Sequence, residues 1–105
     1  MSEVKVSVTF RHMESTEALR KYAEEKIRRI GKYFYTPSEA HVVLSVDSRD
    51  RQVAEIELHA HGTIINGKEE MDDLYSAIDL VIDKIERQVQ KRKEKTKLSR
   101  RRTKA

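Results

Sequence analysis

Basic side chains collect on one flank of residues 72–97, and this grouping is the strongest candidate for a binding site in the sequence. At about 100° per residue of an α-helix, Lys84, Lys91 and Lys95 fall within roughly 40° of one another, with Arg87 just behind them. The opposite flank is acidic and holds Asp79, Asp83 and Glu86. The helix dipole accounts for acidic residues early and basic residues late in a helix, but not for a separation around the axis. The basic flank is therefore predicted to bind a polyanion.

These residues lie on a predicted amphipathic α-helix. One face repeats apolar side chains at helical spacing, at Leu74, Ile78, Val81, Ile82, Ile85 and Val89. Either Asp72 or Asp73 can cap the first turn, where a carboxylate also suits the dipole. At 1.5 Å per residue the helix would be about 37 Å long, so its last turns should project beyond the core of a small domain.

Charge is also sorted along the chain, whose net charge is +4. Residues 84–105 hold eleven Lys or Arg and two Glu, a net charge of +9, whereas residues 1–83 hold eleven basic and sixteen acidic residues, a net charge of −5. A polyanion would be drawn to one end of such a molecule. A membrane partner is not expected, because the basic end lacks an apolar face that could enter an interface and no apolar run is long enough to span a bilayer.

Earlier segments supply the elements on which the long helix must pack. Residues 4–10 alternate valine or phenylalanine with polar side chains and are predicted to form a half-buried strand. Thr16 and Glu17 mark the start of a helix that should run to about Tyr33. Further strands are predicted at residues 42–46, 54–60 and 63–65, with a turn at residues 47–50 and a closing turn at Asn66-Gly67.

The predicted order β-α-β-β-β-α indicates the α+β class. A helical crossover favours parallel pairing of the first two strands, and hairpins make the others antiparallel. The economical solution is a two-layer fold, in which both helices cover one face of a four-stranded sheet. The other face should be open to water and carries Lys5, Thr9, Glu55, Glu57 and His59. We expect residues 1–95 to form this domain and residues 96–105 to be a basic, disordered tail.

No catalytic, cofactor or metal motif is found in the sequence. There is no glycine-rich phosphate loop, nucleophile elbow or cysteine, so we expect neither an enzyme nor a cofactor. His59 and His61 share a strand face, but a third metal ligand with sensible spacing is missing. Helix-start electrostatics explains the acidic residues near the long helix, which are Glu69, Glu70, Asp72 and Asp73.

Nucleic-acid binding is the function that these observations favour. The open sheet face carries no aromatic side chain on which bases could stack, so a sheet-face reader of single strands is disfavoured. Lysine and arginine on a helix face contact phosphates, which carry no sequence information. Recognition should therefore depend on the shape of a folded RNA.

Several segments resemble the ribosome hibernation promoting factors, a family that includes protein Y and was formerly described as sigma-54 modulation proteins. The most specific are DLYSAID at residues 73–79 and DKIERQ at residues 83–88, supported by TEALRKYAEEKIRRIGKYF at residues 16–34 and VAEIELHAHG at residues 53–62. The resemblance runs from Val4 to about Lys95. It implies a fold that resembles a double-stranded-RNA-binding domain with an extra first strand.

The resemblance also implies a partner. The family binds rRNA of the small ribosomal subunit, in the channel where mRNA and tRNA anticodon stems pass. This chain is therefore expected to be a non-enzymatic, cytoplasmic factor that competes with mRNA and tRNA and blocks translation in idle ribosomes. The family's basic helix positions match Lys26, Arg29, Lys32, Lys84, Arg87 and Lys91, and the flank geometry adds Lys95.

The sequence also bears on assembly and leaves two alternative functions open. Long members add a C-terminal domain that pairs ribosomes, which the sequence to Ala105 does not contain, so ribosome dimerisation by this chain alone is not expected. The free protein is expected to be a monomer. Two alternatives stay open, a general structured-RNA-binding protein and a protein–protein regulator of a sigma factor. Competition by unrelated duplex RNA would separate the first, and weak salt dependence of binding would mark the second.

The arrangement of the two helices predicts the shape of the binding surface. Helices packed on one sheet face lie about 8–10 Å apart. One basic row on each helix, at residues 26–32 and 84–95, should thus form a single positive band that meets separate RNA segments at once.

Overall fold

The architecture is described by a computed structural model that covers residues 3–34, 37–60 and 62–104, with side chains described as far as Lys91. In chain order the elements are β1 (Val4–Arg11), α1 (Glu17–Arg28), the 3-10 helix η1 (Arg29–Tyr33), β2 (Ser38–Val46), β3 (Gln52–Ala60), β4 (Thr63–Met71) and α2 (Leu74–Lys104). The predicted order β-α-β-β-β-α is confirmed.

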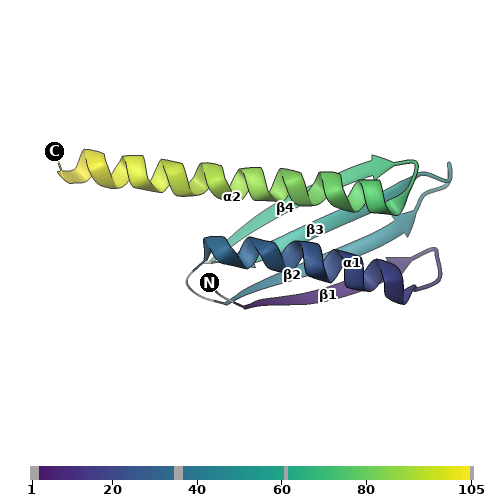
Figure 1. Ribbon diagram of the computed structural model, residues 1–105. Helices are drawn as coiled ribbons and strands as arrows, with labels where there is room; N and C mark the ends of the chain where they lie inside the picture. The colour runs from purple at the N-terminus through teal and green to yellow at the C-terminus, as the bar shows by residue number, and fades with distance from the viewer. Residues whose placement is uncertain (1–2, 35–36, 61, 105) are drawn as a thin grey trace.

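The four strands form one sheet in the order β1-β2-β3-β4. As predicted, β1 and β2 are parallel, and the other two pairs are antiparallel. Both helices lie over the same face of this sheet (Figure 1). Fully buried side chains from both layers meet there, among them Ile27, Ile30, Leu44, Leu58, Ile78 and Ile85. The α+β class and the two-layer arrangement are therefore confirmed.

The start and the end of α1 follow from local sequence. The Thr16 hydroxyl accepts a hydrogen bond from the Leu19 amide at 3.2 Å, which satisfies a free amide of the first turn. The helix keeps α geometry to Arg28 and then tightens into η1, which contains Gly31. The helical segment ends at Tyr33 as predicted, but its last turn is 3-10, because glycine weakens an α-helix.

The fourth strand is longer than the sequence predicts. β4 runs for nine residues, and Asn66 and Gly67 pair with β3 within it, so the predicted closing turn at these residues was wrong. A Cβ at position 67 would lie 3.1 Å from side-chain atoms of both Val81 and Ile85 on α2. The glycine therefore lets the helix pack closely on the strand, and it does not mark a turn.

The acidic residues that precede α2 have different roles. Asp73 caps the helix, because its carboxylate accepts from the Ser76 amide at 2.9 Å and from the Ser76 hydroxyl at 2.7 Å. These two hydrogen bonds lower the pKa of Asp73. Glu69 and Glu70 belong to β4, so assigning them to the helix start was wrong.

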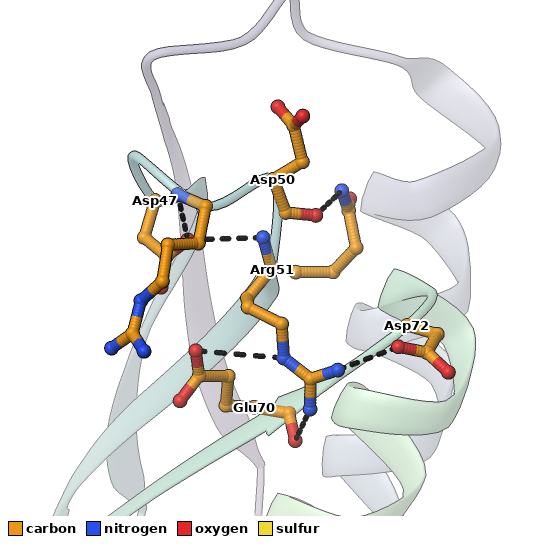
Figure 2. Close-up of polar contacts among 7 residues, drawn as sticks. Asp47, Asp50, Arg51, Glu70 and Asp72 are labelled. Atoms are coloured by element: carbon orange, nitrogen blue, oxygen red, sulfur yellow. Dashed lines mark hydrogen bonds and ion pairs between the residues drawn. The ribbon is translucent and has the colours of Figure 1, made fainter.

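The β2–β3 hairpin is tied to the start of α2 by Arg51 (Figure 2). The Asp47 carboxylate accepts from the backbone amides of Arg49 and Arg51, at 2.8 and 3.0 Å, and these hydrogen bonds lower the pKa of Asp47. The Arg51 guanidinium lies 2.6 Å from the Asp72 carboxylate and 3.6 Å from that of Glu70. One side chain thus links two turns at the same end of the sheet.

The last helix also extends further than predicted. α2 has 31 residues, about 46 Å at 1.5 Å per residue, and its C-terminal half projects beyond the sheet (Figure 1). The predicted end at Lys97 was wrong, because no glycine or proline interrupts residues 74–104. The side chains from residue 92 onward lie outside the described residues. The division into a domain at residues 1–95 and a basic, disordered tail at residues 96–105 stays a prediction. Despite this length, no helix in the described part of the chain is apolar enough to cross a membrane.

Candidate nucleic-acid interface

The two helices lie side by side and run in the same direction over the sheet (Figure 1). Tyrosines of the first helical segment bond to carboxylates of α2. The Tyr22 hydroxyl donates to Asp79 at 2.6 Å, and the Tyr33 hydroxyl donates to Glu86 at 2.8 Å. Gln90 in turn donates to the Tyr33 oxygen at 2.8 Å. We call this line of contacts the helix seam.

The seam has a measurable electrostatic consequence at Tyr22. The hydrogen bond to Asp79 is the main reason why the pKa of Tyr22 rises from 10.0 to about 12. Ionisation would remove the donated proton and place a second negative charge beside the carboxylate. The phenol is thus held neutral as a structural donor.

The predicted basic row on the first helical segment is divided by this arrangement. The Lys26 ammonium lies 3.5 Å from Asp79 and 5.3 Å from the centre of the Tyr22 ring, so it contributes to the seam. Arg29 and Lys32 are exposed and form no ion pair with any described residue. Of the three residues in this row, only Arg29 and Lys32 can therefore bind a partner without first breaking an ion pair.

The basic flank of α2 faces the outer edge of the sheet. The Lys84 ammonium lies 3.4 Å from Glu69 on β4, and the Gln88 amide donates to the backbone oxygen of Asn66 on the same strand at 3.2 Å. Because β4 is an edge strand, this flank lies on the side of α2 that is away from α1.

The remaining basic residues of α2 lie further out. Arg87 pairs with Asp83 at 3.6 Å across one helical turn, with both side chains mostly exposed. Lys91 is exposed and has no ion pair with a described side chain. Lys95 is part of α2, but its side chain lies outside the described residues.

The predicted single positive band across both helices was wrong. The side of α2 that faces the first helical segment carries the acidic residues Asp79 and Glu86, both bonded to tyrosines. The lysines at 84 and 91 lie on the opposite side of the helix, beyond the apolar stripe. An acidic strip therefore separates the two basic rows.

Three cations are left exposed at one level of the helix pair. Arg29 and Lys32 belong to η1, and Lys91 follows Gln90, which contacts Tyr33 of η1. From this level onward α2 projects from the sheet and carries the eight basic residues that follow Lys91 in the sequence. Positive charge is thus concentrated at the end of the molecule opposite the β2–β3 hairpin, where Arg51 lies (Figure 1).

Sequence reasoning missed the partners that neutralise part of the predicted site. The sequence predicts Glu69 as part of a helix start and the tyrosines Tyr22 and Tyr33 as the edge of the core. It does not predict that these side chains contact Lys84, Asp79 and Glu86. The one available signal was the spacing of the two tyrosines on one flank of the first helix. Which element that flank faces depends on tertiary packing.

A metal site would need several ligating side chains close together. Among the described residues, no group of three or more histidine, cysteine, aspartate or glutamate side chains could hold a metal ion. Of the two histidines considered from the sequence, His61 lies outside the described residues. The His59 ring contacts Glu57 and lies 5.5 Å from the ring of His41 on the open sheet face.

Comparison with known proteins gives one family. Residues 6–97 match the family model described as "Sigma 54 modulation protein / S30EA ribosomal protein". The chain is 36% identical over 92 residues to the ribosome hibernation promoting factor of Azotobacter vinelandii, covering 88% of this chain and 85% of that protein. It is 35% identical over 94 residues to the Escherichia coli K12 factor, covering 90% and 98%. Against the longer Lactococcus lactis factor, 36% identity over 99 residues covers 92% of this chain and 52% of the relative.

Solved structures show the same architecture. The Protein Y N-terminal domain of Thermus thermophilus is similar with a TM-score of 0.76 and 35% identity, over 85% of this chain and 97% of that domain. A ribosomal subunit interface protein from Coxiella burnetii gives a TM-score of 0.75 and 25% identity, over 86% and 98%.

Proposed function

The chain belongs to the Sigma 54 modulation protein / S30EA ribosomal protein family, and we propose that it binds the small ribosomal subunit in the mRNA and tRNA channel and blocks translation there. Its relatives are ribosome hibernation factors by name, which supports a hibernation role for this chain. A factor of this kind would act where idle ribosomes are, in the cytoplasm.

One observation carries this proposal. The basic C-terminal part of α2, residues 84–104 with a net charge of +9, begins over the sheet and extends beyond it, beside the exposed cations Arg29 and Lys32. Such a projecting positive arm can enter a narrow space lined by phosphates, where several contacts form together. An isolated duplex offers fewer simultaneous contacts to the same arm.

The residues proposed to contact rRNA differ in whether they already form an ion pair within the protein. Arg29, Lys32 and Lys91 have no ion pair with a described residue, so they can bind phosphate directly. The other proposed contact residues with described side chains must first separate from a carboxylate; these are Lys26, Lys84 and Arg87. These pairs are partly or largely exposed, and such pairs are worth only about 0–1 kcal/mol, so exchanging a carboxylate for a phosphate is affordable. Lys95, one turn beyond Lys91, would extend the contact along the helix.

The proposed mechanism is occupation of space, without catalysis. Bound protein would fill the positions that mRNA and tRNA require, so it would compete with both. Inhibition of translation should therefore be stoichiometric, with an endpoint near one protein per ribosome. Inhibition at a small fraction of that ratio, or cleavage of rRNA, would contradict the proposal.

Co-sedimentation with purified small subunits tests the proposal. We expect the protein to sediment with small subunits, and we expect excess mRNA together with initiator tRNA to release it. Binding that survives this competition would place the protein outside the channel. Release by an equal mass of unrelated duplex RNA would favour the general structured-RNA-binding alternative.

A further inference from the structure

The three described tyrosines are not equivalent. Tyr22 and Tyr33 each donate a hydrogen bond to a carboxylate of α2. The hydroxyl of Tyr75 bonds to no residue that the structure describes, and 44% of this residue is exposed. Packing and hydrogen bonding therefore account for two of the tyrosines and leave the third displayed to solvent.

The Tyr75 ring is nevertheless held in place. It meets the ring of Tyr22 edge to face, with centroids 4.9 Å apart and planes at 77°. Tyr22 is itself fixed by its 2.6 Å hydrogen bond to Asp79 and by the Lys26 ammonium 5.3 Å from its ring centre. The edge-to-face arrangement of the two tyrosine rings is a favoured aromatic geometry. An exposed aromatic surface that is oriented in advance loses little entropy when a flat ligand stacks on it.

The charge around the seam suits a base better than a phosphate. Beside the tyrosine pair, the Asp79 carboxylate is paired with the Lys26 ammonium at 3.5 Å, so no unpaired positive charge is present there to hold a phosphate on the rings. A nucleobase is neutral, and stacking on an aromatic ring needs no particular sequence. Arg29, about 10 Å further along the same flank than Tyr22, is exposed and can hold a phosphate of the same strand.

We propose that Tyr75, braced by Tyr22, is a stacking site for an unpaired RNA base. This deepens the function proposed above and rests on it for the identity of the RNA. Folded RNA displays unpaired bases in loops and bulges, and duplex RNA does not. The site would thus let a protein whose other contacts are to phosphates distinguish folded RNA from a plain duplex.

A fluorescent base can report on this contact directly. The probes are an RNA hairpin with 2-aminopurine in its unpaired loop and a fully paired duplex with the same number of phosphates. Wild-type protein should bind the hairpin more tightly and should quench its fluorescence, because the base stacks on Tyr75. Tyr75→Leu removes the ring and keeps an apolar side chain, so it should lose the quenching.

The affinities of the variants for the hairpin and the duplex provide a second test of stacking. Tyr75→Leu should weaken hairpin binding about 5- to 150-fold, the range for one lost base–aromatic stack, and should leave duplex binding and the salt slope unchanged. Tyr75→Phe keeps the ring and should bind as wild type. Leu80→Ala is the matched control, because Leu80 is an equally exposed apolar residue of α2, at 42%.

Two results would overturn the proposal. One is wild-type protein that prefers neither probe, and the other is Tyr75→Leu protein that binds and quenches the hairpin as wild type does. A loss in Tyr75→Phe as large as in Tyr75→Leu would point to the hydroxyl and also contradict stacking. Failure of the ribosomal proposal looks different, because wild-type protein would then discriminate the probes but not sediment with small subunits.

Discussion

The two flanks of α2 carry opposite charges for different reasons. On the side toward the first helical segment, Asp79 and Glu86 accept hydrogen bonds from tyrosine hydroxyls and hold the helix pair together. On the other side, the lysines at 84 and 91 lie near the sheet edge or in solvent. The acidic flank of α2 therefore has a structural role, and the basic flank is available for binding.

The energies of the two flanks should differ accordingly. A hydrogen bond from a tyrosine to a carboxylate, partly shielded between two helices, contributes on the order of 1 kcal/mol to folding. An exposed lysine–carboxylate pair contributes about 0–1 kcal/mol and is weakened by salt. Changes on the acidic flank should thus be visible in stability, and changes on the basic flank in RNA binding.

The largest effect should come from the apolar stripe between the flanks. Ile85 is fully buried against the sheet, and Ile85→Ala should lower the free energy of unfolding by about 2–5 kcal/mol, because it leaves a cavity. Chemical denaturation measures this change. An unfolding curve like that of wild type would show that the stripe does not hold α2 on the sheet.

The next effect concerns the cations that have no ion pair with a described residue. The double variant Arg29→Gln and Lys32→Gln should flatten the salt dependence of small-subunit binding by roughly two units of slope. The matched control is Arg20→Gln with Arg28→Gln, which removes the same charge from residues paired with Glu17 and Glu24. Equal changes in the two double variants would mean that net charge alone matters.

A smaller effect is expected at the seam. Tyr33→Phe should lower the free energy of unfolding by about 0.5–1.5 kcal/mol, because it removes the hydrogen bond to Glu86. Lys84→Gln, on the opposite flank, should change it by less than about 0.5 kcal/mol. Thermal melts of both variants make the comparison, and a reversed order would invalidate the assignment of roles to the two flanks.

The smallest effect is a titration. The hydrogen bond to Asp79, with a smaller contribution from burial, raises the pKa of Tyr22 from 10.0, the ordinary value for tyrosine, to about 12 in the folded protein. Since the folded value is the higher one, the stabilisation from this contact is complete below pH 10 and is lost as pH rises through about 12. Ring NMR signals of Tyr22 should show this ionisation, and Asp79→Asn should move it to lower pH. An unchanged titration in Asp79→Asn would exclude the hydrogen bond as its cause.

The sequence predicts the elements well because their apolar periodicities are clear. Alternation in β1 and the helical repeat from Leu74 to Val89 each correspond to one buried face. The length of β4 was not predictable in this way. Asn-Gly is normally a turn signal, whereas Gly67 is needed here because Val81 and Ile85 approach its backbone.

The binding site was predictable only in part, for a geometric reason. Periodicity places residues around one helix, but it does not say which neighbour each flank faces. The pairing of Lys26 with Asp79 and of Lys84 with Glu69 arises only when α1, α2 and β4 are assembled. Local sequence therefore identifies the cations, and the fold determines which of them are exposed.

The salt dependence of small-subunit binding tests the central claim most directly. Two triple variants of α2 are compared with wild type, one with Lys84, Arg87 and Lys91 changed to Gln, and one with Asp79→Asn, Asp83→Asn and Glu86→Gln. We predict that the basic-flank variant binds more weakly and loses roughly three units of slope in log K against log salt, about one per phosphate contact. The acidic-flank variant should keep the wild-type slope. Equal losses of slope in the two variants would contradict the account, because they would show that the basic flank does not provide the RNA contacts.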